Sequence, residues 1–380
     1  MKTIIGITKA IDRPITGIVT SKSHLPWSRK NYIRVSGNAK SCPFGYAATI
    51  SLEETSNDMG KRFVTVKDIK EFTDGDVVTI YPNGRIIFNY EISSDHNALF
   101  ATGRCNHRCI MCPQPPITKE ESLTPFNLHL ISLFDKSTKE VGITGGEPTL
   151  IGDDLFLLVN AIKSKLPNSG VSLLTNGVKF ADESYARKLA NCAHPNLQID
   201  VPIFSDIAEE HDRIVGANTF YKTVKGLYNL ALYKQQIGIR IVIHKLTYKR
   251  LPQLAEYIYH NFPFVCQVAF MQMETIGYAE DNIAKLWIDP ADYNDELSKA
   301  IELLDMRGMN PYIYNAQLCV LPEHLRKYAV QSISDWKDIY LEQCEGCSLK
   351  GMCGGFFSAN RKYISKKISP VINTDGIKSI

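Results

Sequence analysis

The chain has 380 residues, with 43 lysines and arginines against 40 aspartates and glutamates, which gives a formal charge of +3. Its 44% hydrophobic and 22% charged residues are typical of a folded globular protein and argue against disorder. The length excludes a small domain held together by disulfides and suggests two or three domains. Because the charge is nearly balanced, we expect neither nucleic acid nor a membrane as a partner.

The beginning of the chain does not have the features of an exported protein. Its short apolar run is interrupted by Gly6 and is shorter than the apolar core of a signal peptide. No run of about 18 apolar residues, long enough to cross a bilayer, is found. We therefore expect a cytoplasmic protein, in which the ten cysteines would bind metal or take part in chemistry more often than form disulfides.

The first predicted domain covers residues 1–96 and is rich in β-strands. The runs 62–66 and 77–91 alternate in polarity or contain β-branched residues. Asn83-Gly84 follows Pro82 within the second run, and this dipeptide is a strong signal for a hairpin turn. The sequence therefore predicts a small β domain with at least one hairpin.

A second predicted domain, residues 97–284, alternates apolar strands with helical segments, as βα units around a parallel sheet do. A clear helix is expected at 220–234, and we place Leu232 on its apolar face together with Val224, Leu227 and Leu230. Six units are too few for an eight-unit barrel, so we expect a partial barrel with ligands at the carboxyl ends of its strands. The six expected strands are 98–102, 140–144, 171–175, 197–203, 238–244 and 267–272.

The third predicted domain covers residues 285–380. It contains an expected helix at 293–307, a short strand at 312–314 and a tail that carries cysteines. The sequence thus indicates an α/β protein with a small β domain at its N-terminus and a separate module at its C-terminus.

Directly after the first strand of the second domain lies the run Cys105-x3-Cys109-x2-Cys112. Three thiolates on one tight loop can each bind one iron of a [4Fe–4S] cluster, which leaves the fourth iron open to a substrate or cofactor. The alternative is a zinc site made by the three cysteines and His107, since structural zinc takes four protein ligands.

Two further turns follow the second and third expected strands. In the first, Gly145 and Gly146 precede Glu147, and two glycines allow a backbone to approach a ligand closely. In the second, Thr175 and Asn176 precede another glycine. Either could be an ordinary turn by itself. Together, on consecutive strand ends beside a three-cysteine loop, they indicate a ligand site.

With these three features, residues 98–275 resemble the radical SAM superfamily, which implies a partial (β/α)6 barrel. The resemblance implies that Cys105, Cys109 and Cys112 hold a [4Fe–4S] cluster whose open iron is chelated by S-adenosylmethionine. It also implies that reductive cleavage of this cofactor gives a 5′-deoxyadenosyl radical, which takes a hydrogen atom from the substrate. The implied contacts to the cofactor are Gly145, Gly146 and Glu147 at the methionine amino group, and Thr175 and Asn176 at the ribose.

Two later segments also resemble parts of this superfamily. Ser205 and Arg213 match the region after the fourth strand, which implies contacts to the cofactor carboxylate or ribose. A capping pair made by His211 and Asp212, with a surface arginine, is the alternative. Residues 274–279 resemble a segment that lines the adenosine pocket, but Gly277 alone could equally mark a turn.

The tail carries Cys344-x2-Cys347-x5-Cys353, with Cys319 upstream. This run resembles the auxiliary-cluster motif of the SPASM and twitch extensions of radical SAM maturases. The further cysteines of the full SPASM pattern are missing, so the resemblance implies one auxiliary [4Fe–4S] cluster on these four residues, as in a twitch module. Zinc bound by the same four cysteines is the alternative.

Segments from the cysteine loop almost to the C-terminus are similar to the His-Xaa-Ser system radical SAM maturases of the HxsC type. That resemblance implies a radical SAM maturase that modifies a ribosomally made precursor peptide. It also implies a second radical SAM protein and an electron donor such as a flavodoxin or ferredoxin as partners. We further expect the β domain to help hold the peptide by strand pairing.

Two other functions stay open on the sequence alone. One is a radical SAM enzyme that acts on a small molecule or on a folded partner protein. The other is a protein without catalytic activity that uses both cysteine groups to bind zinc and thereby shape an interaction surface.

Overall fold

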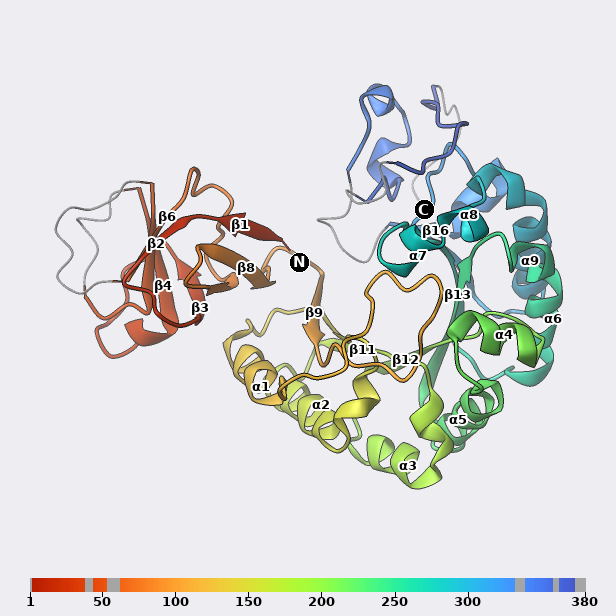
Figure 1. Ribbon diagram of the computed structural model, residues 1–380, viewed down its shortest axis with the longest axis horizontal. Coiled ribbons are helices and arrows are strands. Elements are labelled where there is room, and N and C mark those ends of the chain that lie inside the picture. The colour runs from red at the N-terminus through yellow and green to blue at the C-terminus, as the bar shows by residue number, and fades with distance from the viewer. Residues whose placement is uncertain (1, 38–43, 53–61, 332–338, 358–361, 373–380) are drawn as a thin grey trace. The chain divides into compact units, whose positions relative to one another are not determined.

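The computed structural model describes residues 2–37, 44–52, 62–331, 339–357 and 362–372 (Figure 1). Contacts divide the chain into two compact units. The first comprises residues 1–100, 123–142 and 157–170, and the second comprises residues 101–122, 143–156 and 171–380.

The predicted N-terminal small β domain is present as an eight-stranded mixed sheet with the order β1-β8-β7-β3-β4-β5-β6-β2. Only Gly6 separates β1 from β2, so the chain continues from one end of this order to the other and the sheet closes on itself. Its strands are β1 (Thr3–Ile5), β2 (Ile7–Lys9), β3 (Ile15–Thr20), β4 (Tyr32–Ser36), β5 (Ala48–Ser51), β6 (Phe63–Thr65), β7 (Val77–Ile80) and β8 (Arg85–Tyr90).

The expected hairpin is confirmed, because β7 and β8 pair antiparallel on either side of the predicted turn. Gly84 has φ +85°, and its carbonyl accepts a hydrogen bond of 2.8 Å from the backbone N–H of Gly6 at the point where the sheet closes. In the described residues β1 pairs with β8 and β2 pairs with β6, so each of these two short strands is paired on one side. The expected pairing of a peptide with the β domain stays a prediction.

The second sheet also has eight strands, in the order β16-β15-β14-β13-β12-β11-β10-β9, and the pairs from β11 to β16 are parallel. It curls in the manner of a partial barrel (Figure 1), as the sequence predicts. The six expected strands are all present, with ends displaced by up to two residues, and β15 and β16 extend the sheet. The strands are β9 (His96–Phe100), β10 (Glu140–Thr144), β11 (Gly170–Leu174), β12 (Leu197–Pro202), β13 (Gln236–Ile243), β14 (Gln267–Gln272), β15 (Pro311–Tyr314) and β16 (Ala329–Val330).

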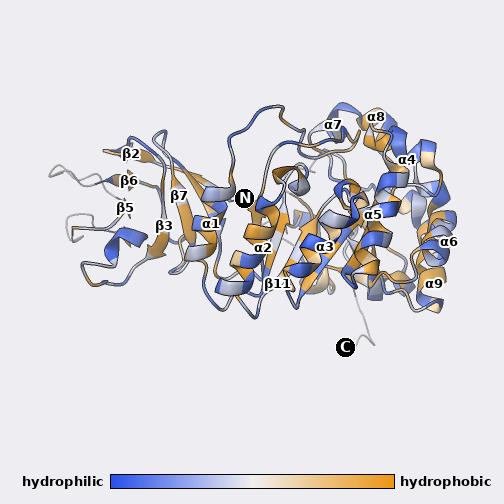
Figure 2. Ribbon diagram, turned by 90° about the horizontal axis from the view of Figure 1, so that it is seen from below, coloured by the Kyte–Doolittle hydropathy of each residue, from blue (hydrophilic) through white to orange (hydrophobic). Residues whose placement is uncertain are grey.

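Helices alternate with these strands along the chain. In Figure 2 the strands are mainly hydrophobic, whereas helices such as α3 and α5 show both hydrophilic and hydrophobic residues, as expected of helices with one buried face. The longer helices are α1 (Thr124–Leu133), α2 (Asp154–Lys165), α3 (Glu183–Asn191), α4 (Ala208–Val215), α5 (Phe220–Leu232), α6 (Leu251–Asn261) and α9 (Asn294–Met306), and the short ones are α7 (Tyr278–Asp281) and α8 (Ile283–Leu286).

One detail of the helix prediction is wrong. Leu227 and Leu230 are fully buried, but Leu232 at the end of α5 is 64% exposed. Successive helical residues are rotated by about 100°, so Leu232 lies about 200° around the helix from Leu230. The apolar residues of this segment therefore do not all share one face.

No helix in the described part of the chain is long and apolar enough to cross a membrane.

Substitution of Gly84 by alanine tests the closure of the first sheet. The new Cβ would collide with the carbonyl oxygen of Gly6, and φ +85° is unfavourable for alanine. We expect a loss of about 1–3 kcal/mol in unfolding free energy, seen by calorimetry as a lower first transition. Gly37→Ala is the matched control, because a Cβ at Gly37 meets nothing within 4 Å. Equal stability of the two variants would contradict the closure.

Candidate functional site

The three-cysteine loop begins five residues after β9 and lies within the second unit. Its backbone is held by the end of α4, since the N–H groups of Arg108 and Ile110 donate to the carbonyls of Val215 and Ile214 at 2.9 and 3.0 Å. On another side, the N–H of Tyr278 in α7 donates to the carbonyl of Cys112 at 2.9 Å. The loop is therefore fixed by main-chain contacts and not by its own side chains alone.

Two glycines allow this close contact. Gly216 follows α4 and Gly277 precedes α7, with φ +66° and +60°, and a Cβ on either would press against backbone atoms of the loop. Gly277 marks a turn, as one of the two interpretations of residues 274–279 predicted, and that turn packs on the carbonyls of Cys112 and Pro113.

Met111 anchors the loop from within. It is 4% exposed and belongs to a buried cluster that also contains Phe204, Ile214, Met273 and Leu286. Cys109 is partly buried against the same cluster. An apolar residue between the second and third cysteines thus packs inward, into a buried cluster that Cys109 also contacts.

All three thiols are partly exposed. Burial raises the pKa of Cys105 to about 11 and that of Cys109 to about 12, with repulsion between neighbouring thiolates as a further cause for both. Burial also raises the pKa of Cys112. Thiolates at such positions need a bound cation, because a coordinated metal stabilises the deprotonated sulfur.

His107 has a structural partner. Its Nε2 lies 2.9 Å from Oγ1 of Thr219, the residue before α5. Oδ1 of Asp212 in turn accepts from the N–H groups of Thr219 and Phe220, both at 2.8 Å, and so caps α5. Burial lowers the pKa of His107 to about 4. The ring is therefore neutral, and its Nε2 already has a partner within the chain.

The turn after β10 lies directly against the chain that leads into Cys105. The N–H of Gly146 donates to the carbonyl of Thr102 at 2.7 Å, and that of Glu147 donates to the carbonyl of Arg104 at 2.8 Å. A Cβ on Gly145 or Gly146 would collide with these same carbonyls. The glycines are thus required for close packing of this turn on the cysteine loop, a reason that the sequence pattern alone did not reveal.

Glu147 is 1% exposed and joins the turns after β10 and β11. Its Oε1 accepts from the N–H and hydroxyl of Thr149 at 3.0 and 2.7 Å and from the hydroxyl of Thr175 at 2.7 Å. Its Oε2 accepts from the N–H of Asn176 at 2.6 Å. Burial raises the pKa of Glu147, and these hydrogen bonds oppose that rise by stabilising the charged form.

Asn176 extends this network to the cysteine loop. Its Nδ2 donates to Oδ1 of Asn106, the residue after Cys105, at 2.6 Å. Its backbone carbonyl accepts from the hydroxyl of Thr223 in α5 at 3.1 Å. The predicted residues Glu147, Thr175 and Asn176 therefore lie together, and they are connected to the loop by Asn106, which sequence reasoning did not single out.

The remaining predicted cofactor contacts are Ser205 and Arg213. Ser205 is 2% exposed, and its hydroxyl donates to Glu210 at 2.9 Å and accepts from the N–H of Ile207 at 3.1 Å. These contacts hold the turn that precedes α4. Arg213 is exposed on α4. An exposed Arg213, and the cap that Asp212 provides at the start of α5, agree with the alternative of a capping pair and a surface arginine, which made no prediction for Ser205.

The four tail cysteines come together around one cavity. It lies beside the short turns Glu342–Cys344 and Lys350–Met352, and apolar side chains such as Leu318, Leu349 and Phe356 share its wall. Burial raises the pKa of Cys319 and of Cys353. Within the described residues, no three histidine, cysteine or acidic side chains converge on a single-ion site. The cysteines that line the cavity are Cys319, Cys344, Cys347 and Cys353.

Substitution of Glu147 by glutamine tests the network. Glutamine has an NH2 group in place of one carboxylate oxygen, so this group would face an N–H or O–H that now donates to Glu147. We therefore expect a loss of about 1–3 kcal/mol in the free energy of unfolding. Hydrogen exchange at the Asn176 amide should become faster, because this N–H donates to Oε2. Glu209→Gln, on an exposed residue of α4, is the control. Unchanged exchange at Asn176 would refute the bridging role.

Comparison with known proteins gives partial matches. Over 160 residues the chain is 26% identical to the GTP 3',8-cyclase of Desulforamulus reducens, covering 40% of this chain and 49% of that protein. Over 172 residues it is 31% identical to the tungsten-containing aldehyde ferredoxin oxidoreductase cofactor-modifying protein of Pyrococcus furiosus, covering 41% and 46%. The chain thus spans about half the length of these curated relatives.

The solved structure of native anSMEcpe with bound AdoMet and Cp18Cys peptide has a TM-score of 0.49 and 18% identity to this chain, over 73% of this chain and 92% of that one. The family model that matches is that of the radical SAM superfamily, over residues 99–258. This range contains the three-cysteine loop, the turn at Glu147 and the turn at Asn176. Residues 99–258 of this chain therefore form a radical SAM superfamily domain.

Proposed function

We propose that this chain is a radical SAM enzyme that modifies a ribosomally made precursor peptide. The observation that carries the proposal is the loop of Cys105, Cys109 and Cys112, which lies in the matched domain and is joined to the turns after β10 and β11. Three partly exposed thiols on a loop fixed from two sides suit a cluster that must keep one iron open.

The cluster with S-adenosylmethionine bound supplies a 5′-deoxyadenosyl radical, which takes a hydrogen atom from the substrate. The residues of the chain fix the position of that event. Glu147 holds the turns after β10 and β11 in register, and Asn176 connects them to Asn106 beside the first cysteine. The backbone around Gly145 and Gly146, together with Thr175 and Asn176, would contact the cofactor. For Ser205 we propose a structural role in the turn before α4, and for Arg213 a surface role, in place of cofactor contact.

We also propose an auxiliary [4Fe–4S] cluster on Cys319, Cys344, Cys347 and Cys353, in a twitch-like module at 285–380. Four thiols around a common cavity provide a complete ligand set for a cluster, in which each sulfur binds a different iron. With all four irons ligated, this site would exchange electrons and would not bind S-adenosylmethionine. The sulfur of Cys347 accepts from the N–H of Val371 at 3.4 Å, and such bonds tune the potential of a cluster.

The peptide substrate is supported by the similarity of the tail and of the loop region to His-Xaa-Ser system maturases of the HxsC type. A second radical SAM protein and an electron donor such as a flavodoxin or ferredoxin belong to the same proposal. A cytoplasmic location agrees with both the donor and the oxygen-sensitive clusters.

A small-molecule substrate is the second candidate. It is favoured by the curated relatives, several of which are GTP 3',8-cyclases. Coexpression with a candidate precursor peptide, followed by mass spectrometry, separates the two. A loss of two hydrogens from the peptide would indicate a crosslink or desaturation, whereas conversion of GTP by the purified protein would overturn the peptide proposal.

Substitution of Cys109 by alanine tests the first cluster. Anaerobically purified protein should contain about eight irons, and the variant about four, if two cubane clusters are present. Formation of 5′-deoxyadenosine from S-adenosylmethionine should be abolished in the variant. Cys192→Ala, which removes a buried thiol outside both cysteine groups, should retain full iron and activity. Retained 5′-deoxyadenosine formation by Cys109→Ala would contradict the assignment.

Substitution of Cys347 by alanine tests the tail separately. We expect loss of about four irons and of modified peptide, while cleavage of S-adenosylmethionine persists because Cys105, Cys109 and Cys112 are intact. Metal analysis and 5′-deoxyadenosine assays distinguish the two effects. Colourless wild-type protein loaded with zinc would overturn both cluster assignments in favour of a non-catalytic zinc protein.

A further inference from the structure

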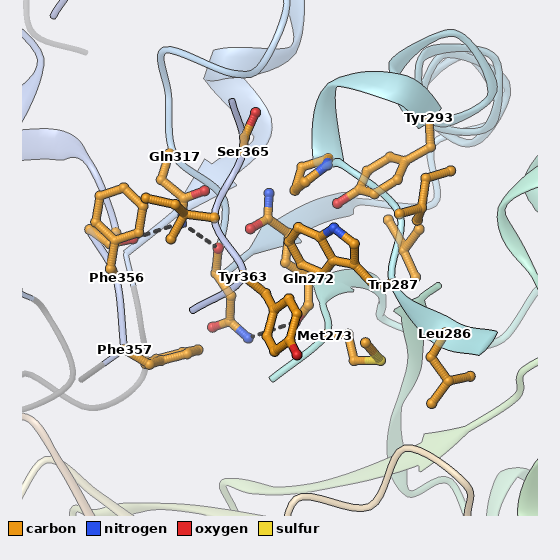
Figure 3. A pocket seen from close by; sticks show the side chains of 17 residues that line it. Gln272, Met273, Leu286, Trp287, Tyr293, Gln317, Phe356, Phe357, Tyr363 and Ser365 are labelled. Carbon is orange, nitrogen blue, oxygen red and sulfur yellow. Dashed lines mark hydrogen bonds between the residues drawn. The ribbon is translucent and has the colours of Figure 1, made fainter. Parts of the chain in front are cut away.

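A second pocket lies beyond the carboxyl ends of β13, β14 and β15. One wall comes from these strand ends and from the segment 286–293, and the other comes from the C-terminal residues 354–357 and 363–365 (Figure 3). The whole pocket lies within the second unit. Ligands of parallel sheets bind at this end of the strands, so its location is that of a ligand site.

This pocket lies between the two cysteine groups. Met273 and Leu286 line it, and both belong to the buried cluster that holds Met111 between Cys109 and Cys112. Gln317 and Phe356 line it as well, and both also line the cavity of the four tail cysteines. The pocket therefore shares lining residues with the cavity of the tail cysteines and a buried cluster with the three-cysteine loop.

The lining chemistry is unusual for an enzyme that would bind a nucleotide. None of the described residues that line the pocket carries a charge. Trp287, Tyr363, Phe356 and Phe357 supply aromatic surface, and Figure 3 shows Trp287 and Tyr363 side by side. A triphosphate placed here would have no cation among these residues, and an unpaired buried charge is strongly unfavourable.

One polar group in the pocket is at most weakly paired. Nε2 of Gln272, at the end of β14, is buried and makes no hydrogen bond of ordinary length, although this side chain interacts with the hydroxyl of Tyr293. The nearby Gln317 differs, since its amide donates to the carbonyl of Gly355 at 2.8 Å. Buried donors in folded proteins are nearly always paired with protein or water, so this donor is open to an acceptor from solvent or from a ligand. A peptide carbonyl oxygen is an uncharged acceptor of this kind.

We propose that this pocket binds an uncharged segment of the peptide substrate. An aromatic or aliphatic side chain packs against Trp287 and Tyr363, and a peptide carbonyl accepts a hydrogen bond from Nε2 of Gln272. This inference rests on the proposed function and adds to it how the peptide is recognised. The bound residue would lie next to the one that reacts, because the pocket shares its core with the three-cysteine loop.

Binding of small uncharged probes tests the proposal without turnover. N-acetyl-L-phenylalaninamide and N-acetyl-L-leucinamide carry the side chains and the carbonyls that the pocket should accept. N-acetyl-L-aspartate amide and GTP carry charge. Saturation-transfer NMR on the full chain, purified anaerobically with its clusters, measures each affinity. We expect the two uncharged probes to bind and the two charged compounds not to displace them.

Variants at two positions of the pocket locate the probe. Gln272→Leu should weaken binding about tenfold, which corresponds to about 1.4 kcal/mol. The melting temperature of the free variant is measured as well, because Gln272 also interacts with the hydroxyl of Tyr293. Trp287→Ala should weaken binding at least as much, and Trp287→Phe should restore most of it. Trp27→Ala is the matched control, since Trp27 is 73% exposed in the first unit.

Three results would overturn the inference: equal affinity in Gln272→Leu and wild type, displacement of the probes by GTP, or the absence of saturable binding. A lower melting temperature of Gln272→Leu with unchanged affinity would assign Gln272 a structural role and would likewise reject the proposal. Cleavage of S-adenosylmethionine by wild-type protein is assayed separately. If the protein cleaves the cofactor but binds no probe, the proposed pocket is rejected and the proposed radical chemistry stands. If the protein binds the probe but does not cleave the cofactor, the proposed radical chemistry is rejected.

Discussion

The buried carboxylate of Glu147 accepts four hydrogen bonds, and the arrangement of the candidate site depends on them. A carboxylate that is 1% exposed is unfavourable by itself, and here donors from two successive strand ends compensate it. Because the donors come from Thr149, Thr175 and Asn176, the negative charge is favourable only while the turns after β10 and β11 stay together. The same charge also lies close enough to the loop to contribute to the raised pKa of Cys105 and of Cys109.

The cysteine loop is placed by contacts that do not involve its sulfur atoms. Main-chain hydrogen bonds from α4 and α7, the inward side chain of Met111 and the Asn106–Asn176 amide contact fix its backbone. His107 adds a further anchor at the start of α5. Such a loop can present three thiols in a defined arrangement before any metal binds, which lowers the entropy lost on assembly of a cluster.

The sequence was most informative where a pattern is repeated or dense. The six strands, the hairpin at Gly84 and the convergence of Glu147, Thr175 and Asn176 could be predicted, because alternation of apolar residues and strand-end turns carry that information. Asn106 could not, since a single asparagine has no periodicity and its partner is 70 residues away. The sequence predicted that the backbone at Gly145 and Gly146 approaches a ligand closely. The structure shows that it approaches the backbone of Thr102 and Arg104, which could be found only in three dimensions. The prediction that Leu232 lies on the buried face of α5 was wrong, because an apolar side chain alone does not define the angular position of a residue on the helix.

The nearly balanced charge of the chain agrees with the uncharged lining of the pocket beyond β14. A net charge of +3 cannot steer a charged substrate strongly, and none of the described residues that line the pocket beyond β14 is charged. Recognition there must therefore rest on aromatic packing and on one buried amide donor, which are short-range and directional. Short-range recognition suits a radical enzyme, because a hydrogen atom is transferred only between atoms in contact, and a residue held against Trp287 constrains its neighbours along a peptide. A substrate recognised mainly by charge would lack that constraint in a pocket of this composition.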